Sequence, residues 1–248
     1  MAEMIEMKND NEELMEDKIE DMETQKMMRR GFIRKVYGII FFQLLITTAV
    51  IYLSMANDIF MKFIIYNSWA LYVSAVATII VFIVLVCGKL TRKVPVNYFL
   101  LFTLTLLEAF LASYTTMYFE PISVLTCAGL TMLIVCGLTI YACFTKRDMT
   151  LMGGFLFILS LILLFLGIIG IFFTSYFYQM LINSIGALLM SLYLIYDTQL
   201  VLGDKKELIS VDDYIMGALM IYLDIINLFL YILKIFGKKN NEKYLIFE

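Results

Sequence analysis

Three carboxylic residues lie within long apolar stretches in which charge is otherwise rare. Asp197 follows a segment, 151–196, that contains no charged side chain, and Glu108 and Asp224 lie in similar surroundings. Placing an ionisable side chain in the middle of a membrane helix costs about 2.5–3.5 kcal/mol even on lenient insertion scales, so such residues usually face a cavity or a partner. These residues are therefore the first candidates for chemistry.

Asp197 and Asp224 belong to consecutive apolar stretches and could form a pair. Two carboxylates a few ångströms apart in a low dielectric cannot both ionise, so they would share a proton and titrate together. A protonated pair can be hydrogen-bonded and closed, whereas an ionised pair repels or attracts a cation. Among physiological divalent ions, Ca²⁺ suits hard oxygen ligands best. The alternative is that both side chains only bond helices together, near Thr198, Gln199 and Asn227.

The helix ends leave contact between the two aspartates open. Gly203 is a plausible residue to end the helix that carries Asp197. With a rise of 1.5 Å per residue, that carboxylate lies about 8–9 Å from the end. The stretch "SVDD" at Ser210–Asp213 is typical of a helix start with Ser210 as N-cap. Asp224 would then lie about 15–20 Å along the next helix, measured from the same face.

Composition predicts that these helices cross a membrane. Of the 248 residues, 62% are hydrophobic and 17% charged, whereas a soluble domain is nearer half apolar and a quarter charged. A spanning helix needs about 20 mostly apolar residues. We therefore expect an all-α integral membrane protein with seven transmembrane helices. The predicted spans are Val36–Ala56, Trp69–Gly88, Asn97–Phe119, Ile122–Phe144, Met149–Phe173, Tyr176–Leu202 and Tyr214–Phe236.

Charge divides the chain into three parts. Residues 1–30 form an acidic, aromatic-free tail that we expect to be cytosolic and mobile. Residues 31–240 form the membrane domain, and 241–248 form a short polar tail. Basic residues gather on the cytoplasmic side of short loops, and their distribution predicts a cytosolic N-terminus. Seven full spans would place Lys238, Lys239 and Lys243 on the opposite side, whereas a re-entrant last segment would keep them inside. Both alternatives stay open.

Several kinds of chemistry find no support in the sequence. The chain has no histidine, which excludes Ser–His and Cys–His nucleophile pairs and histidine-ligated zinc. The four cysteines show neither metal-ligand nor redox spacing, and we interpret them as packing residues. No glycine loop suited to phosphate is present, and the basic residues lie at membrane edges rather than in a nucleic-acid-binding patch. We expect no resident cofactor and no nucleic-acid partner. The cysteines are Cys87, Cys127, Cys136 and Cys143.

Ordered sequence blocks resemble a known family. "SLYLIYDTQLVLGD" followed by "DDYIMGALMIYLDIINLFLYILKIFG" is similar to the C-terminal signature of the Bax inhibitor/Lifeguard family, the transmembrane Bax inhibitor motif proteins. "RKVYGIIFFQLLITTAV", "FTLTLLEAFL" and "GLTIYACFTKRDMT" match other segments of the family in the expected order. The resemblance covers residues 30–240 and is nearest to the Lifeguard branch, which includes the Golgi anti-apoptotic proteins.

The resemblance implies a fold and an activity. Six helices would surround a central C-terminal helix in an endoplasmic reticulum or Golgi membrane. The protein would not be an enzyme but a pH-sensitive Ca²⁺ leak channel that lowers store calcium and protects against cell death. Asp197 and Asp224 would sense pH and lie on the ion path, binding Ca²⁺ transiently. Asp212 and Asp213 would form an acidic loop site that influences ion access, and Glu108 remains an accessory candidate. Candidates for a basic latch on the pair are Lys89, Arg92 and Lys93.

Two other classes of function remain as alternatives. A non-conducting scaffold could bind cell-death regulators or calcium-release channels through the charged tail. An intramembrane aspartyl protease also carries aspartates on two consecutive helices, one of them in a Tyr-Asp pair as at Tyr196–Asp197. Its second aspartate, however, follows a Gly-x-Gly turn, and Asp224 has no glycine before it. We therefore rank the protease below the channel and the scaffold.

Overall fold

The computed structural model describes residues 2–87, 90–170, 172–173, 175–203 and 209–240, and this part of the chain is helical and has no β-strand. Short 3₁₀ turns precede α4 and α6, at Leu90–Arg92 and Thr150–Met152. The α-helices are α1 (Ala2–Ala56), α2 (Asp58–Tyr66), α3 (Ser68–Cys87), α4 (Val96–Thr116), α5 (Pro121–Phe144), α6 (Gly153–Gly170), α7 (Tyr176–Leu202) and α8 (Tyr214–Phe236).

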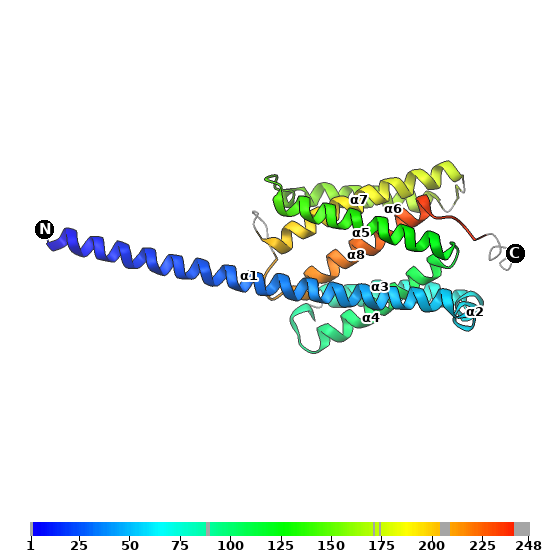
Figure 1. Cartoon of the computed structure of the whole chain (residues 1–248), viewed down its shortest axis with the longest axis horizontal. Helices are drawn as coiled ribbons and strands as arrows, with labels where there is room; N and C mark the ends of the chain where they lie inside the picture. The colour runs from blue at the N-terminus through cyan, green and yellow to red at the C-terminus, as the bar shows by residue number, and fades with distance from the viewer. Residues whose placement is uncertain (1, 88–89, 171, 174, 204–208, 241–248) are drawn as a thin grey trace.

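Seven helices in the described residues are long and apolar enough to cross a membrane, which confirms the predicted class. They are α1 and α3 to α8, and all but α1 coincide with a predicted span to within a few residues. The largest difference concerns α1, whose spanning portion begins at Lys18 rather than at Val36. The helix α6 begins at Gly153 after a 3₁₀ turn rather than at Met149. The short α2 follows α1 and links it to α3 at one end of the bundle (Figure 1).

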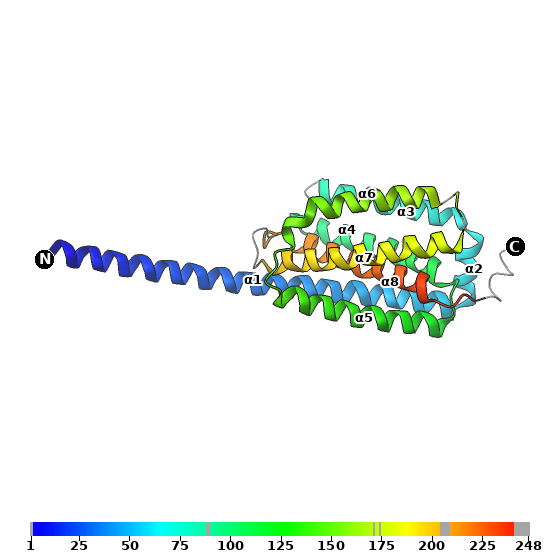
Figure 2. The ribbon, with the colours of Figure 1, turned by 90° about the horizontal axis from the view of Figure 1, so that it is seen from above.

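The seven spans run alongside one another in one bundle, and α1 projects far beyond it at the end where the chain begins (Figures 1 and 2). The outermost spans, α3 and α6, are the least buried. Their exposed side chains are large and apolar, among them Ile79, Ile83, Phe157 and Phe165. An apolar surface of this extent is costly in water, so these faces contact lipid.

The last span, α8, is the most buried of the seven. It packs against α7, α1, α5 and α4. Its largest fully buried side chain is Tyr222, and four aliphatic residues of the same helix are buried as completely. The expected ring of six helices around α8 stays a prediction. The aliphatic residues are Ile215, Leu219, Leu228 and Leu233.

The acidic N-terminal segment belongs to α1, which runs without a break from Ala2 through the predicted boundary at residue 30. Glutamate, methionine and lysine are good helix formers, so this segment can continue the helix of the first span. Its described side chains, from Lys18 to Met28, are exposed. The division of the chain into tail and membrane domain therefore stays a prediction, because no change of secondary structure marks it.

The C-terminal residues after α8 bind the loop between α4 and α5. Lys238 Nζ lies 2.8 Å from a carboxylate oxygen of Glu120, whose backbone N–H donates to the Lys238 carbonyl at 2.9 Å. The backbone N–H of Asn240 donates to the Tyr118 carbonyl. This contact lies at the end of the bundle opposite the projecting part of α1 (Figure 1). The structure therefore favours a full last span over a re-entrant one. Glu120 neutralises the charge of Lys238 at this end of the bundle. Lys243 lies outside the described residues.

Close approach between α7 and α8 depends on Gly186. A Cβ atom built at this residue would lie 2.5 Å from two ring carbons of Tyr231 on α8. Small residues allow membrane helices to pack closely in this way. By contrast, a Cβ atom at Gly154 on α6 would meet nothing within 4 Å.

We predict that Gly186→Val lowers the melting temperature of the purified protein, because the new side chain would force the Tyr231 ring out of its site. Overpacking of this kind should lower it by at least about 5 °C. Gly154→Val is the matched control and should leave melting unchanged. Equal melting temperatures for the two variants would contradict the close approach of α7 and α8 at Gly186.

Candidate functional site

The carboxyl groups of Asp197 and Asp224 meet between α7 and α8. The two side chains are hydrogen-bond partners, and the two residues are only 3% and 7% exposed. A carboxylate can accept but not donate a hydrogen bond, so a bond between two carboxyl groups requires one proton. The contact therefore requires that at least one of the two acidic residues be protonated.

The pair lies inside the bundle rather than at its edge. Asp197 precedes Leu202, the last residue of α7, by five positions, or about 8 Å of helix. Asp224 follows Tyr214, the first residue of α8, by ten positions, or about 15 Å. The two helices are the most extensively packed pair in the fold. Their contact answers the question that the helix ends alone left open.

One oxygen of each carboxyl group has no partner among the described residues. These atoms are Asp197 Oδ1 and Asp224 Oδ2, and both are inaccessible to solvent. A buried polar atom without a hydrogen bond is costly, so this pair of oxygens is suited to a water molecule, a second proton or a cation. Ca²⁺ takes six to eight oxygen ligands, and two carboxyl groups supply at most four. No cluster of three or more Asp, Glu, Cys or His residues exists in the described chain, so a Ca²⁺ ion here would keep part of its water and bind transiently.

The neighbouring amides have other partners. Gln199, fully buried on α7, accepts a hydrogen bond from the Met149 backbone and donates to the Arg147 carbonyl, at 2.8 and 3.1 Å. Asn227 Nδ2 donates to the carbonyl of Leu223 on its own helix. Gln199 thus joins α7 to the loop before α6. The alternative that Asp197 and Asp224 only bond helices together stays open, because their own hydrogen bond joins α7 to α8.

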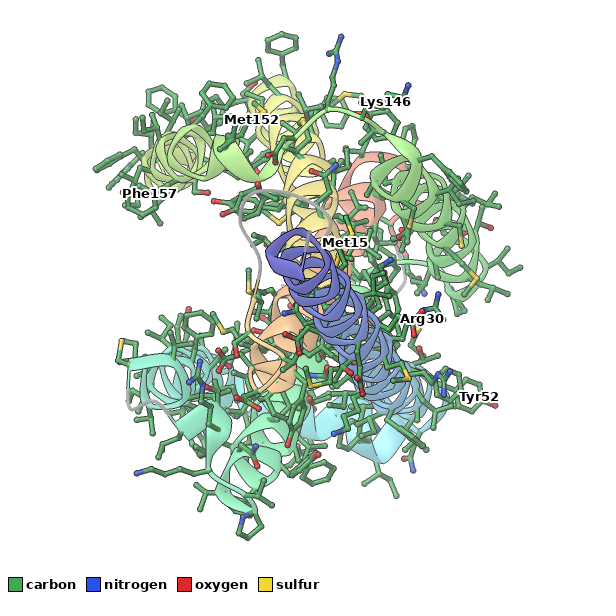
Figure 3. The ribbon with its side chains drawn as sticks, turned by 90° about the vertical axis from the view of Figure 1, so that its left-hand side faces the viewer. Met15, Arg30, Tyr52, Lys146, Met152 and Phe157 are labelled. Carbon is green, nitrogen blue, oxygen red and sulfur yellow. The ribbon has the colours of Figure 1, made fainter. Side chains whose placement is uncertain are left out.

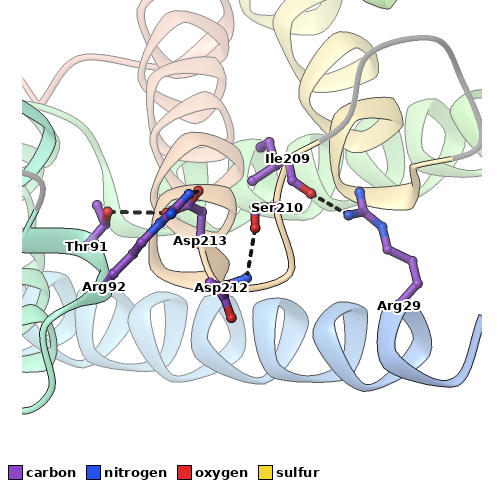
Figure 4. Close-up of polar contacts among 7 residues, drawn as sticks. All are labelled: Arg29, Thr91, Arg92, Ile209, Ser210, Asp212 and Asp213. Carbon is purple, nitrogen blue, oxygen red and sulfur yellow. Dashed lines mark hydrogen bonds and ion pairs between the residues drawn. The ribbon is translucent and has the colours of Figure 1, made fainter. Parts of the chain in front are cut away.

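Arg29 of α1 binds the end of α7 and the loop that follows it, and Figure 4 shows its bond to Ile209 in that loop. Its guanidinium donates to the carbonyls of Leu200, Leu202 and Ile209, at 2.5, 3.2 and 2.5 Å. The last carbonyls of a helix have no partner within the helix, and here an arginine distant in sequence satisfies two of them. Gly203 ends α7 with a φ of 72°, as predicted, and a Cβ atom there would lie 2.5 Å from Arg29 Nε.

Arg92 and Asp213 form an ion pair at the same end of the bundle (Figure 4). Arg92 donates through Nε and Nη2 to the two carboxylate oxygens, at 2.7 and 2.5 Å, and Thr91 Oγ1 lies 3.5 Å from one of them. The hydrogen bonds from Arg92 hold the pKa of Asp213 below its usual value. The pair fastens the 3₁₀ turn before α4 to the start of α8.

The predicted helix start needs correction, whereas the latch stays a prediction. Asp213, not Ser210, is the N-cap of α8, and its side chain makes no capping bond because Arg92 engages it. Ser210 instead accepts from the backbone N–H of Asp212, an exposed residue in the same loop. Arg92 is bound to Asp213 and not to the Asp197–Asp224 pair. Lys93 is exposed, and Lys89 lies outside the described residues.

Glu108 lies on α4, apart from the aspartate pair. It lines a cavity of about 210 Å³ together with residues of α3 and α8. The lining includes two polar side chains, Thr78 and Asn227, that the sequence did not single out as sites. Glu108 makes no hydrogen bond or ion pair with the described residues around it.

Fold and site together define a class: a seven-span helical membrane protein with a carboxyl pair buried between its last two spans. The family model described as inhibitor of apoptosis-promoting Bax1 matches residues 29–241. The chain therefore belongs to the Bax inhibitor family.

Individual relatives place the chain near the Lifeguard branch, as the sequence blocks predicted. Human protein lifeguard 3 is 36% identical over 220 residues, which cover 87% of this chain and 71% of the relative. Mouse protein lifeguard 3 is 34% identical with the same coverage. Mouse protein lifeguard 4 is 32% identical over 215 residues, 87% of this chain and 88% of the relative.

We predict that Arg29→Gln speeds amide hydrogen exchange at the end of α7, because the Leu202 carbonyl loses the arginine donor and the Leu200 carbonyl keeps only the Ile209 N–H, so that the last turn opens more often. Exchange in a peptide covering residues 196–203 should rise at least about fivefold. Arg30→Gln is the control, since Arg30 is the neighbouring exposed arginine. If both variants exchange like the wild type, Arg29 does not hold this helix end.

We also predict a pH-dependent effect of Asp213→Asn on stability. Because the folded pKa of Asp213 is depressed, its ion pair contributes stability above the unfolded pKa of about 3.9, and this contribution is lost as the pH falls through the folded value. The variant should melt about 2 °C below the wild type at pH 6. The difference should shrink as the pH falls below about 4. Asp212→Asn, in the same loop, should show no such pattern.

Proposed function

We propose that this protein is a pH-sensitive Ca²⁺ leak pathway of an intracellular membrane, gated by Asp197 and Asp224. The observation that carries the proposal is the contact of two buried carboxyl groups on adjacent spans, each with one oxygen left without a protein partner. A site of this kind can exchange a proton for a cation.

The pair has two forms that hold α7 and α8 differently. With one shared proton, a hydrogen bond joins the helices. Without it, two like charges about 4 Å apart repel by about 4 kcal/mol at an effective dielectric constant of 20. A Ca²⁺ ion can relieve this repulsion by binding both carboxylates. Protons and Ca²⁺ therefore compete for the same oxygens, and permeation through the bundle becomes dependent on pH.

The end of the bundle near the pair has the features of a controlled entrance. We propose that this end faces the cytosol, in keeping with the basic residues around it. Arg29 holds the end of α7 and the Arg92–Asp213 pair holds the start of α8. Asp212, exposed beside them, supplies a negative charge that attracts cations to the loop.

The protective role in cell death and the cellular location are proposals that rest on the family. The matched family is described as inhibitor of apoptosis-promoting Bax1, and we propose that this chain acts likewise, in the endoplasmic reticulum or Golgi, by lowering stored Ca²⁺. We infer that it is not an enzyme. The projecting part of α1 (Figure 1) is the feature that favours the scaffold alternative, in which cell-death regulators or calcium-release channels bind the acidic tail.

The test is Ca²⁺ flux into liposomes that contain the full chain, followed from pH 5.5 to pH 8. We predict that the double variant Asp197→Asn, Asp224→Asn loses the pH dependence. Asparagine is neutral and forms hydrogen bonds as a protonated carboxyl group does. The variant should therefore show, at every pH, the flux that the wild type shows at low pH.

Asp21→Asn is the control, because Asp21 is an exposed carboxylate on the projecting part of α1. Its flux should follow that of the wild type. An unchanged pH profile in the double variant would refute the gating role of the pair. Flux that persists while deletion of residues 1–28 abolishes protection of cells would favour the scaffold. A proteolytic product lost in the double variant would favour the protease.

A further inference from the structure

The cavity that contains Glu108 lies between three spans and is separate from the aspartate pair. Its lining comes from α3, α4 and α8 and includes neither Asp197 nor Asp224. Glu108 lies twelve residues into α4 and Thr78 ten residues into α3, so both are at least about 12 Å from either end of their helices. The cavity is therefore at the depth of the hydrocarbon. The lining residues are Thr78, Ile79, Phe82, Leu104, Glu108, Leu223 and Asn227.

The polar groups in this cavity present oxygen acceptors. Thr78 Oγ1 is buried and has no hydrogen-bond partner among the described residues. Asn227 uses an N–H to donate to the Leu223 carbonyl, which leaves its carbonyl oxygen as an acceptor. The hydroxyl of nearby Tyr222 is 2.8 Å from Thr47 Oγ1 and is thus already bonded. A carboxyl group, a hydroxyl and an amide oxygen remain for a ligand that donates hydrogen bonds.

The charge and size of the cavity indicate the class of ligand. None of the described lining residues is basic, so a cation complements Glu108. A single carboxylate neutralises only half of the charge of a Ca²⁺ ion, whereas it matches the charge of a monovalent cation. The remaining walls are apolar, and the ring of Phe82 can face a cation. The cavity volume of about 210 Å³ exceeds the roughly 150 Å³ of an engineered cavity that holds benzene. The cavity therefore has room for a ligand whose apolar body lies against these apolar walls.

The route to the cavity is from the lipid. The cavity is not fully enclosed, and Ile79 of its lining is 60% exposed on α3, the least buried span. Seen end-on in Figure 3, α3 and α4 lie on one side of α8, while α6, which carries Phe157, lies on the other. A ligand dissolved in the bilayer can therefore reach Glu108 without passing the loops at either end of the bundle.

We propose that this cavity binds a protonated amine with an apolar body, which enters from the bilayer. The ammonium group donates to Glu108, Thr78 Oγ1 and the oxygen of Asn227, while the apolar part lies against Phe82 and Leu104. The amine and the carboxyl group share one ionisable proton, so the positive charge of the ammonium group balances the negative charge of the carboxylate and the complex is neutral overall. This site is independent of the proposed Ca²⁺ pathway, since no residue is common to both.

The experiment uses the full chain in phosphatidylcholine nanodiscs and a primary hexylamine that carries a diazirine, with the corresponding hexanol as the neutral probe. After irradiation, labelled peptides are identified by mass spectrometry. We expect the amine to label α3, α4 and α8, and phenethylamine but not 2-phenylethanol to compete. Glu108→Gln should reduce labelling at least about tenfold, the loss expected for one charge-assisted hydrogen bond.

Two further variants separate binding from folding. Thr78→Val removes only the acceptor hydroxyl and should weaken labelling about threefold to tenfold. Glu120→Gln makes the same chemical change as Glu108→Gln at the α4–α5 loop, outside the cavity, and should label like the wild type. Melting temperatures of all variants confirm that they are folded.

Three results would overturn the proposal. Equal labelling by the amine and the alcohol would show a purely apolar site. Unchanged labelling in Glu108→Gln would remove the carboxyl group from recognition. Displacement of the amine by millimolar Ca²⁺, together with loss of Ca²⁺ flux in Glu108→Gln, would assign Glu108 to the ion path instead. Ca²⁺ flux in the Asp197 and Asp224 variants is measured separately. A failure of the amine-binding proposal would therefore leave the proposed function intact.

Discussion

The contact between Asp197 and Asp224 is the constraint on which the rest of the bundle depends. Two carboxyl groups can meet away from water only if a proton or a cation lies between them, so the packing of α7 on α8 is tied to an ion equilibrium. An aliphatic pair at the same place would hold the helices together regardless of solution conditions. Here the two most buried spans carry two buried acidic side chains, and in the proposed function titration makes and breaks the contact between them.

The surrounding polar contacts bring α7 to a defined position so that this pair can form. Gln199 fixes one side of α7 to the loop before α6, and Arg29 fixes its last turn to α1. The left-handed backbone at Gly203 permits the arginine to approach, since a side chain there would collide with the guanidinium. Three segments far apart in the chain therefore determine where one carboxyl group lies.

The spans could be predicted from sequence because hydropathy depends on local composition alone. The two aspartates could also be found, since a carboxylate in an apolar run is conspicuous. The contact between the two aspartates could not be predicted, because it depends on the offset between α7 and α8 along their axes. Ser210 was wrongly assigned as the helix cap because nothing in the local pattern shows that Arg92, 121 residues earlier, engages Asp213. Thr78 escaped notice, and Asn227 was considered only as a neighbour of the aspartates, for a similar reason: only the fold brings these two residues to Glu108.

The two ends of α8 are fastened to different parts of the protein. At one end Asp213 is paired with Arg92, and at the other Lys238 and Asn240 are bonded to the α4–α5 loop. A helix fixed at both ends cannot shift along its axis, but it can rotate about that axis or bend. Any response of α8 to the charge on Asp224, near its middle, must then be a twist or a bend. Such a movement would change the width of the bundle while leaving its length unaltered.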